Sequence, residues 1–492
     1  MTNCSCCKYT DKKFKLPIIL LKNYRITPSN STLFQFLILI SLIFPNFEPY
    51  FERYRYIMID YNKFTLSNGL RVIHNYDPTT AMVAVNVLYN VGARDEDSEM
   101  TGLAHLFEHL MFGGSVNIPD FDAEIERAGG MNNAWTSNDF TNFYDVAPAR
   151  NFETLLWLES DRMLGLAFSD KALEVQRNVV IEEFKQTHLN RPYGDLSHRL
   201  REMVYRQHPY GVPTIGKDPS HIEKVTQQDV RDFFFSHYAP NNAVLAISGN
   251  VSPDQVRRGV ERWFDSIPRR DVAPRNYAPE PLPDSPRKTE IRGHVPQTCV
   301  VVAYPMPGYG QPGYIECDLI TDILASGRSS RFYRRLLLGS DLFTSADAVI
   351  TGSEEPGMLM LKGNLADPSE EAARVAVERL MAEASQLCYQ ASRPDRLSYT
   401  LTEARPGGVT PYEVERAINR FASDFTFSSL SYLQRAQSLA MAEMHGEDIN
   451  EIVPAYRRVT TAMIANTARR VLDPRHACVL IYRPTEQSVP TA

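Results

Sequence analysis

Residues 102–114 place two histidines and one glutamate in a run of otherwise apolar residues and glycines, Gly-Leu-Ala-His-Leu-Phe-Glu-His-Leu-Met-Phe-Gly-Gly. In an α-helix, positions i, i+3 and i+4 share one face, so His105, Glu108 and His109 would project into the same small volume. Two imidazoles there are typical ligands of a metal ion, and the carboxylate can act as a base. The spacing therefore predicts a zinc site that carries its own base.

The order of these residues is the reverse of the commoner H-E-x-x-H pattern, because the glutamate precedes the second histidine. Catalytic zinc takes three protein ligands and leaves one position open for water. A third ligand must therefore come from another part of the chain.

The best candidates for the third ligand are Glu182 and Glu183, on a long helix predicted over residues 171–190. Adjacent helix residues point about 100° apart, so spacing alone does not choose between them. Glu183 is in line with Gln176 and Val180, and we favour it on that ground. Glu182, or a surface role for this acidic pair, is the alternative. Glu108 would then be the general base that takes a proton from the attacking water.

The composition is that of an ordinary folded protein. The chain has 492 residues, of which 43% are apolar and 23% charged, enough for two or three domains with a large core. The net charge is −7, and the first 57 residues carry +5, which leaves −12 on the remainder. A net charge this negative on residues 58–492 argues against a nucleic-acid partner. The seven cysteines show no metal-finger spacing, and we expect buried free thiols rather than disulfides.

Residues 1–57 differ from the rest of the chain. A basic stretch precedes an apolar run at 33–44, which has the length of a signal-peptide core but is too short to span a bilayer. No small-residue cleavage site follows it, so we favour a translated leader with no fold of its own and Met58 as the working start. A membrane-targeting segment is the alternative. The first interpretation predicts a cytoplasmic protein, and the second a periplasmic or membrane-associated one.

After the leader, strand and helix patterns alternate regularly. Asn68-Gly69 is a typical hairpin turn between two strands in 63–74. The run 82–91 alternates like a strand with one buried face, and Ser252-Pro253 is typical of a helix N-cap followed by proline. Further strands are predicted at 132–136, 140–146 and 243–248, and further helices at 121–128 and 150–165.

The same order of elements recurs after a proline-rich stretch at 272–286. Strands are predicted at 288–292, 298–304, 346–351 and 358–363, and helices at 315–324 and 330–338. We interpret this as a weak internal repeat of one α+β unit, because the order of elements matches and the sequence does not. The second copy has no His or Glu cluster on its corresponding helix, so catalysis would belong to the first half. Residues 386–408 are predicted to form a surface loop.

Together these motifs resemble those of the pitrilysin or insulinase family of zinc peptidases (peptidase family M16), with the mitochondrial-processing-peptidase-like bacterial members as the most similar branch. The resemblance covers about residues 62–484. It is carried by His105-Leu-Phe-Glu-His109, by Glu183, and by the runs 132–142, 237–242 and 327–333.

The resemblance implies Zn²⁺ on His105, His109 and Glu183, with Glu108 as catalytic base. It also implies that the strand around Asn133 and Ala134 offers its edge to an extended peptide substrate. The implied activity is that of a zinc metalloendopeptidase acting on extended peptides or small unfolded proteins in an enclosed chamber.

The implied fold is α+β, with two tandem homologous α/β-sandwich units (the LuxS/MPP-like metallohydrolase fold) that form one half of a clamshell. The chain would divide into a leader (1–57), a catalytic zinc-peptidase domain (60–270), a linker (271–287) and a non-catalytic C-terminal domain of the same family (288–484). Since the family's working enclosure has two halves, we expect a homodimer, or a heterodimer with a second subunit that lacks the metal motif. We favour the heterodimer.

The sequence departs from the family pattern in two respects. Gln176 stands where relatives commonly carry an acid, so the charge of that acid is absent or replaced. The Arg and Tyr that many relatives contribute from the opposite half to hold the scissile carbonyl have no counterpart that we can assign in this chain.

Less specific interpretations stand beside these. Asn133 could be a turn or strand-end residue that satisfies backbone groups. Arg328 and Arg331 could only cap or solvate a helix start. Three further histidines are interpreted as surface or packing residues rather than ligands: His188, His198 and His208. For the whole protein, the alternative function is a non-catalytic core or scaffold subunit of an assembly built on the same fold.

Overall fold

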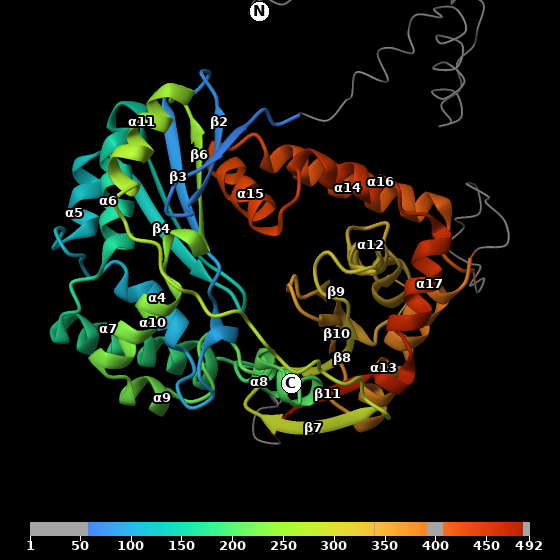
Figure 1. Cartoon of the computed structure of the whole chain (residues 1–492). Helices are drawn as coiled ribbons and strands as arrows, with labels where there is room; N and C mark the ends of the chain where they lie inside the picture. The colour runs from blue at the N-terminus through green and yellow to red at the C-terminus, as the bar shows by residue number, and fades with distance from the viewer. Residues whose placement is uncertain (1–57, 339, 391–406, 486–492) are drawn as a thin grey trace, which may run out of the picture. The chain divides into compact units, whose positions relative to one another are not determined.

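The structure is a computed structural model that describes residues 58–338, 340–390 and 407–485. It contains two β-sheets that follow one another along the chain, with helices on both faces of each (Figure 1). The predicted α+β fold with two tandem α/β units is therefore confirmed. The leader at 1–57 and most of the loop predicted at 386–408 lie outside the described residues.

The first sheet has six strands in the order β1-β2-β6-β3-β5-β4. Neighbours pair antiparallel except β2 and β6, which are parallel. The strands are β1 (Asn62–Thr65), β2 (Arg71–Tyr76), β3 (Met82–Tyr89), β4 (Met131–Thr136), β5 (Thr141–Pro148) and β6 (Ala243–Gly249). Each corresponds to a strand expected from the sequence.

The second sheet has five strands in the order β7-β11-β8-β10-β9. They are β7 (Arg287–Gly293), β8 (Thr298–Met306), β9 (Phe343–Ile350), β10 (Gly357–Leu365) and β11 (Cys478–Pro484). Without β1, both sheets run first, last, second, fourth, third in chain order, and in both the first and last strands are the parallel pair. The shared strand order confirms the internal repeat.

The helices of the first half are α4 (Leu103–Leu110), α5 (Phe121–Arg127), α6 (Phe152–Leu164), α7 (Asp170–Phe184), α8 (Leu196–Val204), α9 (Pro219–Lys224), α10 (Gln227–His237) and α11 (Pro253–Phe264). Those of the second half are α12 (Tyr314–Ala325), α13 (Glu370–Ser385), α14 (Pro411–Ser428), α15 (Tyr432–His445), α16 (Ile452–Arg457) and α17 (Thr461–Val471). Ser252 caps α11 as expected, since its side chain accepts the N–H of Gln255.

Strand β3 is buried on both faces, and the expectation of one exposed face was wrong. Val83, Val85 and Val87 pack into the core under α4 and α6, while Ala84 and Leu88 face the opposite side of the sheet. That opposite side is covered by α15, a helix that the sequence places 340 or more residues further along. The local sequence around β3 does not indicate that a helix covers this face of the sheet.

The second sheet receives its cover in the reciprocal way. One face packs on helices of the second half, and the other packs on α8 from the first half. Leu200, Met203 and Val204 of α8 meet Val301 and Leu480 of the second sheet in one apolar cluster. Each sheet therefore depends on a helix from the other half to bury one of its faces.

The proline-rich segment between α11 and β7 contains no helix or strand, yet it is tied to the first half. The Arg275 guanidinium donates to Asp95 at 2.7 Å and to Asn90 Oδ1 at 2.6 Å. The Tyr277 hydroxyl lies 3.0 Å from Asp95 Oδ1, and Glu280 accepts the N–H groups of residues 206–208. These contacts fix the course of the predicted linker.

Charged groups from both halves meet around Glu354, in the turn between β9 and β10. Glu354 pairs with Arg94, with Arg275 at 3.6 Å and with His445 at 3.4 Å, and its N–H donates to Asp139 at 3.1 Å. Arg94, only 2% exposed, also pairs with Asp139 at 3.1 Å. Because a buried charge that loses its partner is costly, this cluster holds the β4–β5 turn against the second sheet.

Two features near Arg331 differ from expectation. Its side chain is buried instead of solvating a helix start, since it donates to Glu413 at 2.7 and 3.0 Å and to the Gly408 carbonyl at 3.1 Å. Arg331 thereby anchors the start of α14, whereas Arg328 is exposed. The helix expected at 330–338 contains a π-helical turn at Tyr333–Leu337.

The expectation of free thiols is confirmed for the cysteines that the structure describes: Cys299, Cys317 and Cys478 are buried and free, and Cys388 is free and partly buried. Among the described residues, we find no helix with the length and apolar character that crossing a membrane requires.

The cover supplied by α15 generates the first prediction. Leu439 is fully buried between α15 and the first sheet, so Leu439→Ala should lower the free energy of unfolding by about 2–5 kcal/mol. Leu430 precedes the same helix and is 63% exposed, so Leu430→Ala should change it by less than about 0.5 kcal/mol. Urea unfolding of both variants checks this, and equal effects would show that α15 does not complete the core.

Candidate functional site

Helix α4 is fixed at its N-terminus by two local features. It begins after Gly102, whose φ is +89°, and a Cβ at that position would lie 2.8 Å from the Ile215 carbonyl oxygen, so glycine is required there. The Glu96 carboxylate accepts the N–H of Gly102 at 2.7 Å and that of Ala104 at 2.8 Å. These donors belong to the first turn, which has no partners within the helix.

The remaining faces of α4 are held by apolar packing. Leu103, Leu106 and Leu110 are buried, and Phe107 contacts the aromatic rings of α10 and of Tyr238. The helix therefore cannot rotate without disturbing the core. Its one polar face, with His105, Glu108 and His109, is directed away from this packing toward α7 and β4.

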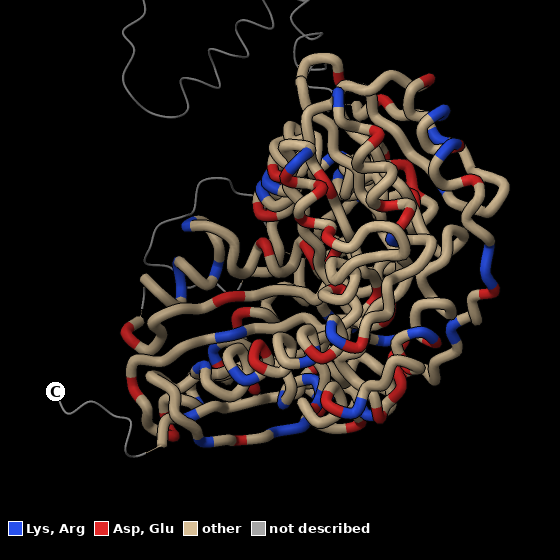
Figure 2. The backbone as a smooth tube through the Cα atoms, turned by 90° about the vertical axis from the view of Figure 1, so that its left-hand side faces the viewer, with Lys and Arg blue, Asp and Glu red and all other residues tan. Residues whose placement is uncertain are grey.

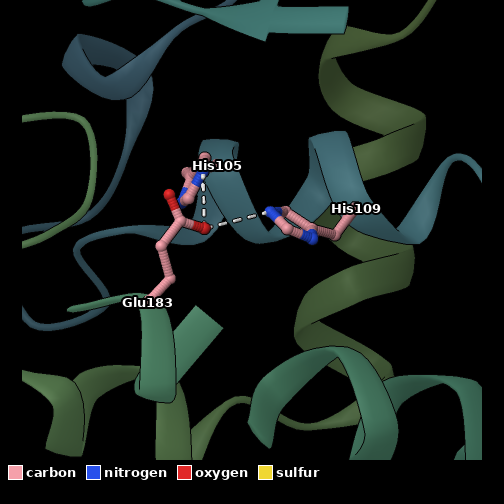
Figure 3. A group of neighbouring side chains, drawn as sticks. All are labelled: His105, His109 and Glu183. Carbon is pink, nitrogen blue, oxygen red and sulfur yellow. Dashed lines mark ion pairs between the residues drawn. The ribbon is translucent and has the colours of Figure 1, made fainter. Parts of the chain in front are cut away.

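Three of the predicted site residues converge (Figure 3). Glu183 Oε2 lies 3.7 Å from His105 Nε2 and 3.6 Å from His109 Nε2. The histidines come from α4 and the glutamate from the last turn of α7. In the described part of the chain, these are the group of three or more His, Cys, Asp or Glu residues whose ligand atoms all lie within 4.8 Å of one another. We call them the metal triad.

The structure separates the two candidate glutamates. Glu183 points to the histidines, whereas the Glu182 side chain is 61% exposed and pairs with Lys185 at 2.6 Å. Helix α7 buries Leu173, Val180 and Ile181, which turns Glu183 toward α4. The placement agrees with the preference for Glu183.

The metal triad fits zinc in donor type and spacing. Tetrahedral zinc with bonds of about 2.0–2.2 Å holds its donor atoms roughly 3.3–3.5 Å apart. The two Nε2···Oε2 separations exceed this by a few tenths of an ångström. Burial, followed by the neighbouring His109, lowers the pKa of His105 to about 4. His105 is therefore neutral at physiological pH, the form in which imidazole binds a metal.

Glu108 lies beside the metal triad and is held by a residue that we did not single out from the sequence. The Thr136 hydroxyl, at the end of β4, donates to Glu108 Oε2 at 2.6 Å. Burial raises the pKa of Glu108, whereas the Thr136 hydrogen bond and His109 lower it. A carboxylate whose pKa is raised by burial is a better proton acceptor, as a general base requires.

Strand β4 is the last strand of the first sheet as far as the sheet is described. Ala134 packs toward the α4 side and Trp135 toward the α15 side, in the alternation of a strand. Asn133 is exposed, and its Oδ1 lies 2.8 Å from the N–H of Ala134. The Asn133 side chain thus satisfies a backbone group, and any contact of Asn133 and Ala134 with substrate stays a prediction.

Two residues of the site were missed by sequence reasoning. Thr136 lies inside the run 132–142, and only the pairing of β4 beside α4 shows which of its residues reaches Glu108. Glu96 precedes α4 by several residues, outside the usual N-cap position, so no capping pattern marks it. His208 matches the expectation of a packing histidine, since it accepts the Tyr210 N–H and packs against the Tyr277 ring.

Charged residues of both signs alternate along the chain. In Figure 2 the Lys and Arg segments are interspersed with Asp and Glu segments over the backbone that is described.

Two adjacent parts of the chain match models of known protein families. The model for the insulinase family (peptidase family M16) matches residues 71–218, and that for the peptidase M16 inactive domain matches residues 224–402. The metal triad lies within the first match.

Individual relatives extend this similarity. The chain is 31% identical to the zinc protease PqqE of Helicobacter pylori over 272 residues, which are 54% of this chain and 61% of that protein. It thus aligns with less than two thirds of that relative. It is 23% identical to the uncharacterized zinc protease YmxG of Bacillus subtilis over 85% of this chain and 97% of that protein.

Solved structures show the same fold. A protease from Helicobacter pylori superposes with a TM-score of 0.77 at 23% identity, over 87% of this chain and all of that one. The periplasmic protease PqqL of Escherichia coli superposes with a TM-score of 0.68 at 16% identity, over 89% of this chain but only 49% of that one. The fold of this chain is therefore similar to that of about half of the larger protein.

The Glu96 contact generates the second prediction. Glu96→Ala leaves the N–H groups of Gly102 and Ala104 without their acceptor, which should cost about 1–3 kcal/mol of unfolding free energy and lower the zinc retained after dialysis. Glu99→Ala, an exposed change in the same loop, is the matched control. Unfolding curves and elemental analysis measure the two effects, and a Glu96→Ala variant as stable as the control would contradict the proposed capping.

Proposed function

The chain belongs to the M16, or insulinase, family of peptidases, and we propose that it is a zinc metalloendopeptidase acting on extended peptides or small unfolded proteins. The observation that carries this proposal is the convergence of Glu183 Oε2 on both histidine Nε2 atoms within 3.7 Å, with Glu108 on the same helix face. We further propose residues 60–270 as the catalytic domain, 271–287 as the linker and 288–484 as the non-catalytic domain.

In the proposed mechanism three residues of this chain bind the metal ion and a fourth transfers the proton. His105, His109 and Glu183 would hold Zn²⁺, which supplies Lewis acidity that polarises a carbonyl and lowers the pKa of water. Glu108 accepts the proton of the attacking water. Because Oε2 already accepts the Thr136 hydroxyl, we assign the transfer to Oε1, which would take this proton and later return it to the leaving amine.

The proposed substrate is a peptide in extended form. An edge strand presents unpaired backbone groups, so a peptide can add to β4 as a further strand. Thr136 at the end of β4 touches Glu108, so a peptide along Asn133 and Ala134 would run toward the base. This arrangement favours backbone recognition, which suits substrates of varied sequence.

A second subunit is proposed to complete the enzyme. The chain superposes on only 49% of the PqqL structure and on 45% of pitrilysin, so it has the size of one half of these larger proteins. We propose that the other half comes from a second M16-type chain, either a copy of this one or a subunit that lacks the metal motif. It would enclose the peptide over the metal triad.

The alternative is a scaffold subunit without activity. It is favoured by the match of residues 224–402 to an inactive-domain model. The metal triad and Glu108 lie outside that match, in the first half, and their geometry favours the catalytic proposal.

The third prediction tests the assigned roles. Glu108→Gln removes the base and spares the ligands, so the variant should retain zinc while peptide hydrolysis falls about 10²–10⁴-fold. His105→Ala should lose both zinc and activity. Elemental analysis and cleavage of a quenched fluorescent peptide measure the two properties.

Glu182 and Glu183 provide the matched controls. Glu183→Gln should lose zinc, whereas Glu182→Gln, one residue away and paired with Lys185, should retain both zinc and activity. Full activity in the Glu108→Gln variant would refute its role as base. Wild-type protein that holds no stoichiometric zinc would refute the peptidase proposal and leave the scaffold.

The fourth prediction concerns pH. The acid limb of kcat/KM reports the ionisation of Glu108, whose pKa burial raises and Thr136 lowers. Thr136→Val removes the contact that lowers the pKa of Glu108, so this pKa should rise and the acid limb should move to higher pH. Ser137→Ala, which removes a hydroxyl that bonds within the turn, should leave the limb in place. A pH–rate profile that is identical in all three proteins would show that Thr136 does not tune the base.

A further inference from the structure

Two histidines that the sequence placed among surface and packing residues lie side by side in the structure. His188 follows α7 in the π-helical segment Lys185–Leu189, and His198 lies on α8. Their ring centroids are 4.7 Å apart with an interplanar angle of 82°. For His105 and His109 the corresponding values are 5.0 Å and 88°. The second pair thus reproduces the ring geometry of the first.

Hydrogen bonds fix which nitrogen of His198 carries a proton. Nε2 lies 2.9 Å from the Gly216 carbonyl oxygen, which can only accept, so Nε2 is protonated. Nδ1 of the neutral ring is then a lone-pair nitrogen. It is buried, and among the described residues no hydrogen-bond donor reaches it.

The same reasoning applies to His188. The Thr187 hydroxyl donates its one proton to the Glu183 carbonyl oxygen at 2.7 Å. His188 Nδ1, 2.7 Å from that hydroxyl, must therefore donate to it, which leaves Nε2 of the neutral ring as the lone-pair nitrogen. Both rings then offer one unprotonated nitrogen each.

The surroundings favour neutral imidazole beside a space that can hold water. Burial lowers the pKa of both histidines, and the charge of His198 lowers that of His188 further. Both line a cavity of about 500 Å³ whose other charged or titratable lining residues are the acids Glu99, Asp195, Glu202 and Asp218, the cations Arg199 and Lys217, and His221. Asp195 is engaged with Arg199 at 3.3 Å and with the Tyr482 hydroxyl at 3.0 Å, so we do not count it as a ligand.

We propose that His188 Nε2 and His198 Nδ1 form a second binding site for a divalent transition-metal ion, separate from the metal triad. Imidazole nitrogen suits Zn²⁺, Ni²⁺ and Cu²⁺, and water in the cavity would complete the coordination. With two protein ligands instead of three, this site should bind more weakly than the first. A cation held there would add positive charge to the cavity lined by Phe184, the residue that follows Glu183.

Zinc titration of the whole chain tests the proposal. Equilibrium dialysis against free zinc raised through the micromolar range, followed by elemental analysis, should give about two ions per wild-type chain, the second taken up at higher free zinc. His188→Gln and His198→Gln should each hold one ion under the same conditions. The glutamine amide can still donate to the Gly216 carbonyl, so His198→Gln keeps that contact. His294→Ala, at an exposed histidine, should hold two like the wild type.

Further variants distinguish zinc bound at this second site from zinc bound at the metal triad. His105→Ala should lose the tighter ion and retain the weaker one, whereas a double variant of His105 and His198 should bind none. If the wild type stops at one ion, or if the His188 and His198 variants still hold two, the second site does not exist. Unfolding curves show which variants are folded, and either single variant that folds is enough to decide. These outcomes do not depend on whether the protein is a peptidase.

Discussion

The structure depends on how its two sheets bury their second faces. A sheet with apolar residues on both faces needs two covers, and the helices of each half supply only one. The missing covers are exchanged, with α15 on the first sheet and α8 on the second. Without this exchange each sheet would expose an apolar face to water. The first sheet, which contains β4 and supports α4, would then lose the helix that packs on its second face.

The candidate site follows from this framework because its residues come from rigid elements. The metal triad joins α4 to the last turn of α7, and Thr136 joins the edge strand to Glu108. The β4–β5 turn that begins beyond Thr136 is held in turn by the charge cluster around Glu354. The second half of the chain carries no metal triad among its described residues, yet it contributes to the position of the strand that bears Thr136.

Much of this could be predicted from the sequence. His105, Glu108 and His109 share one helical face because of their spacing, and the hairpin at Asn68-Gly69 and the capped start of α11 follow local rules. Glu183 was preferred by helical phase, and its position agrees. Contacts between distant segments could not be predicted in this way. The burial of β3 under α15, the anchoring of α14 by Arg331 and the pairing of His188 with His198 each depend on tertiary packing that no local pattern records.

The exchange of helices also orders the events of synthesis. The helix that covers the first sheet, α15, is translated only after most of the second half, since it spans residues 432–445. Until then the first half emerges from the ribosome with one apolar sheet face bare, which is a state that favours aggregation or chaperone binding. Contacts so distant in sequence also close slowly. The first sheet, on which α4 and β4 rest, thus receives its second cover late in synthesis.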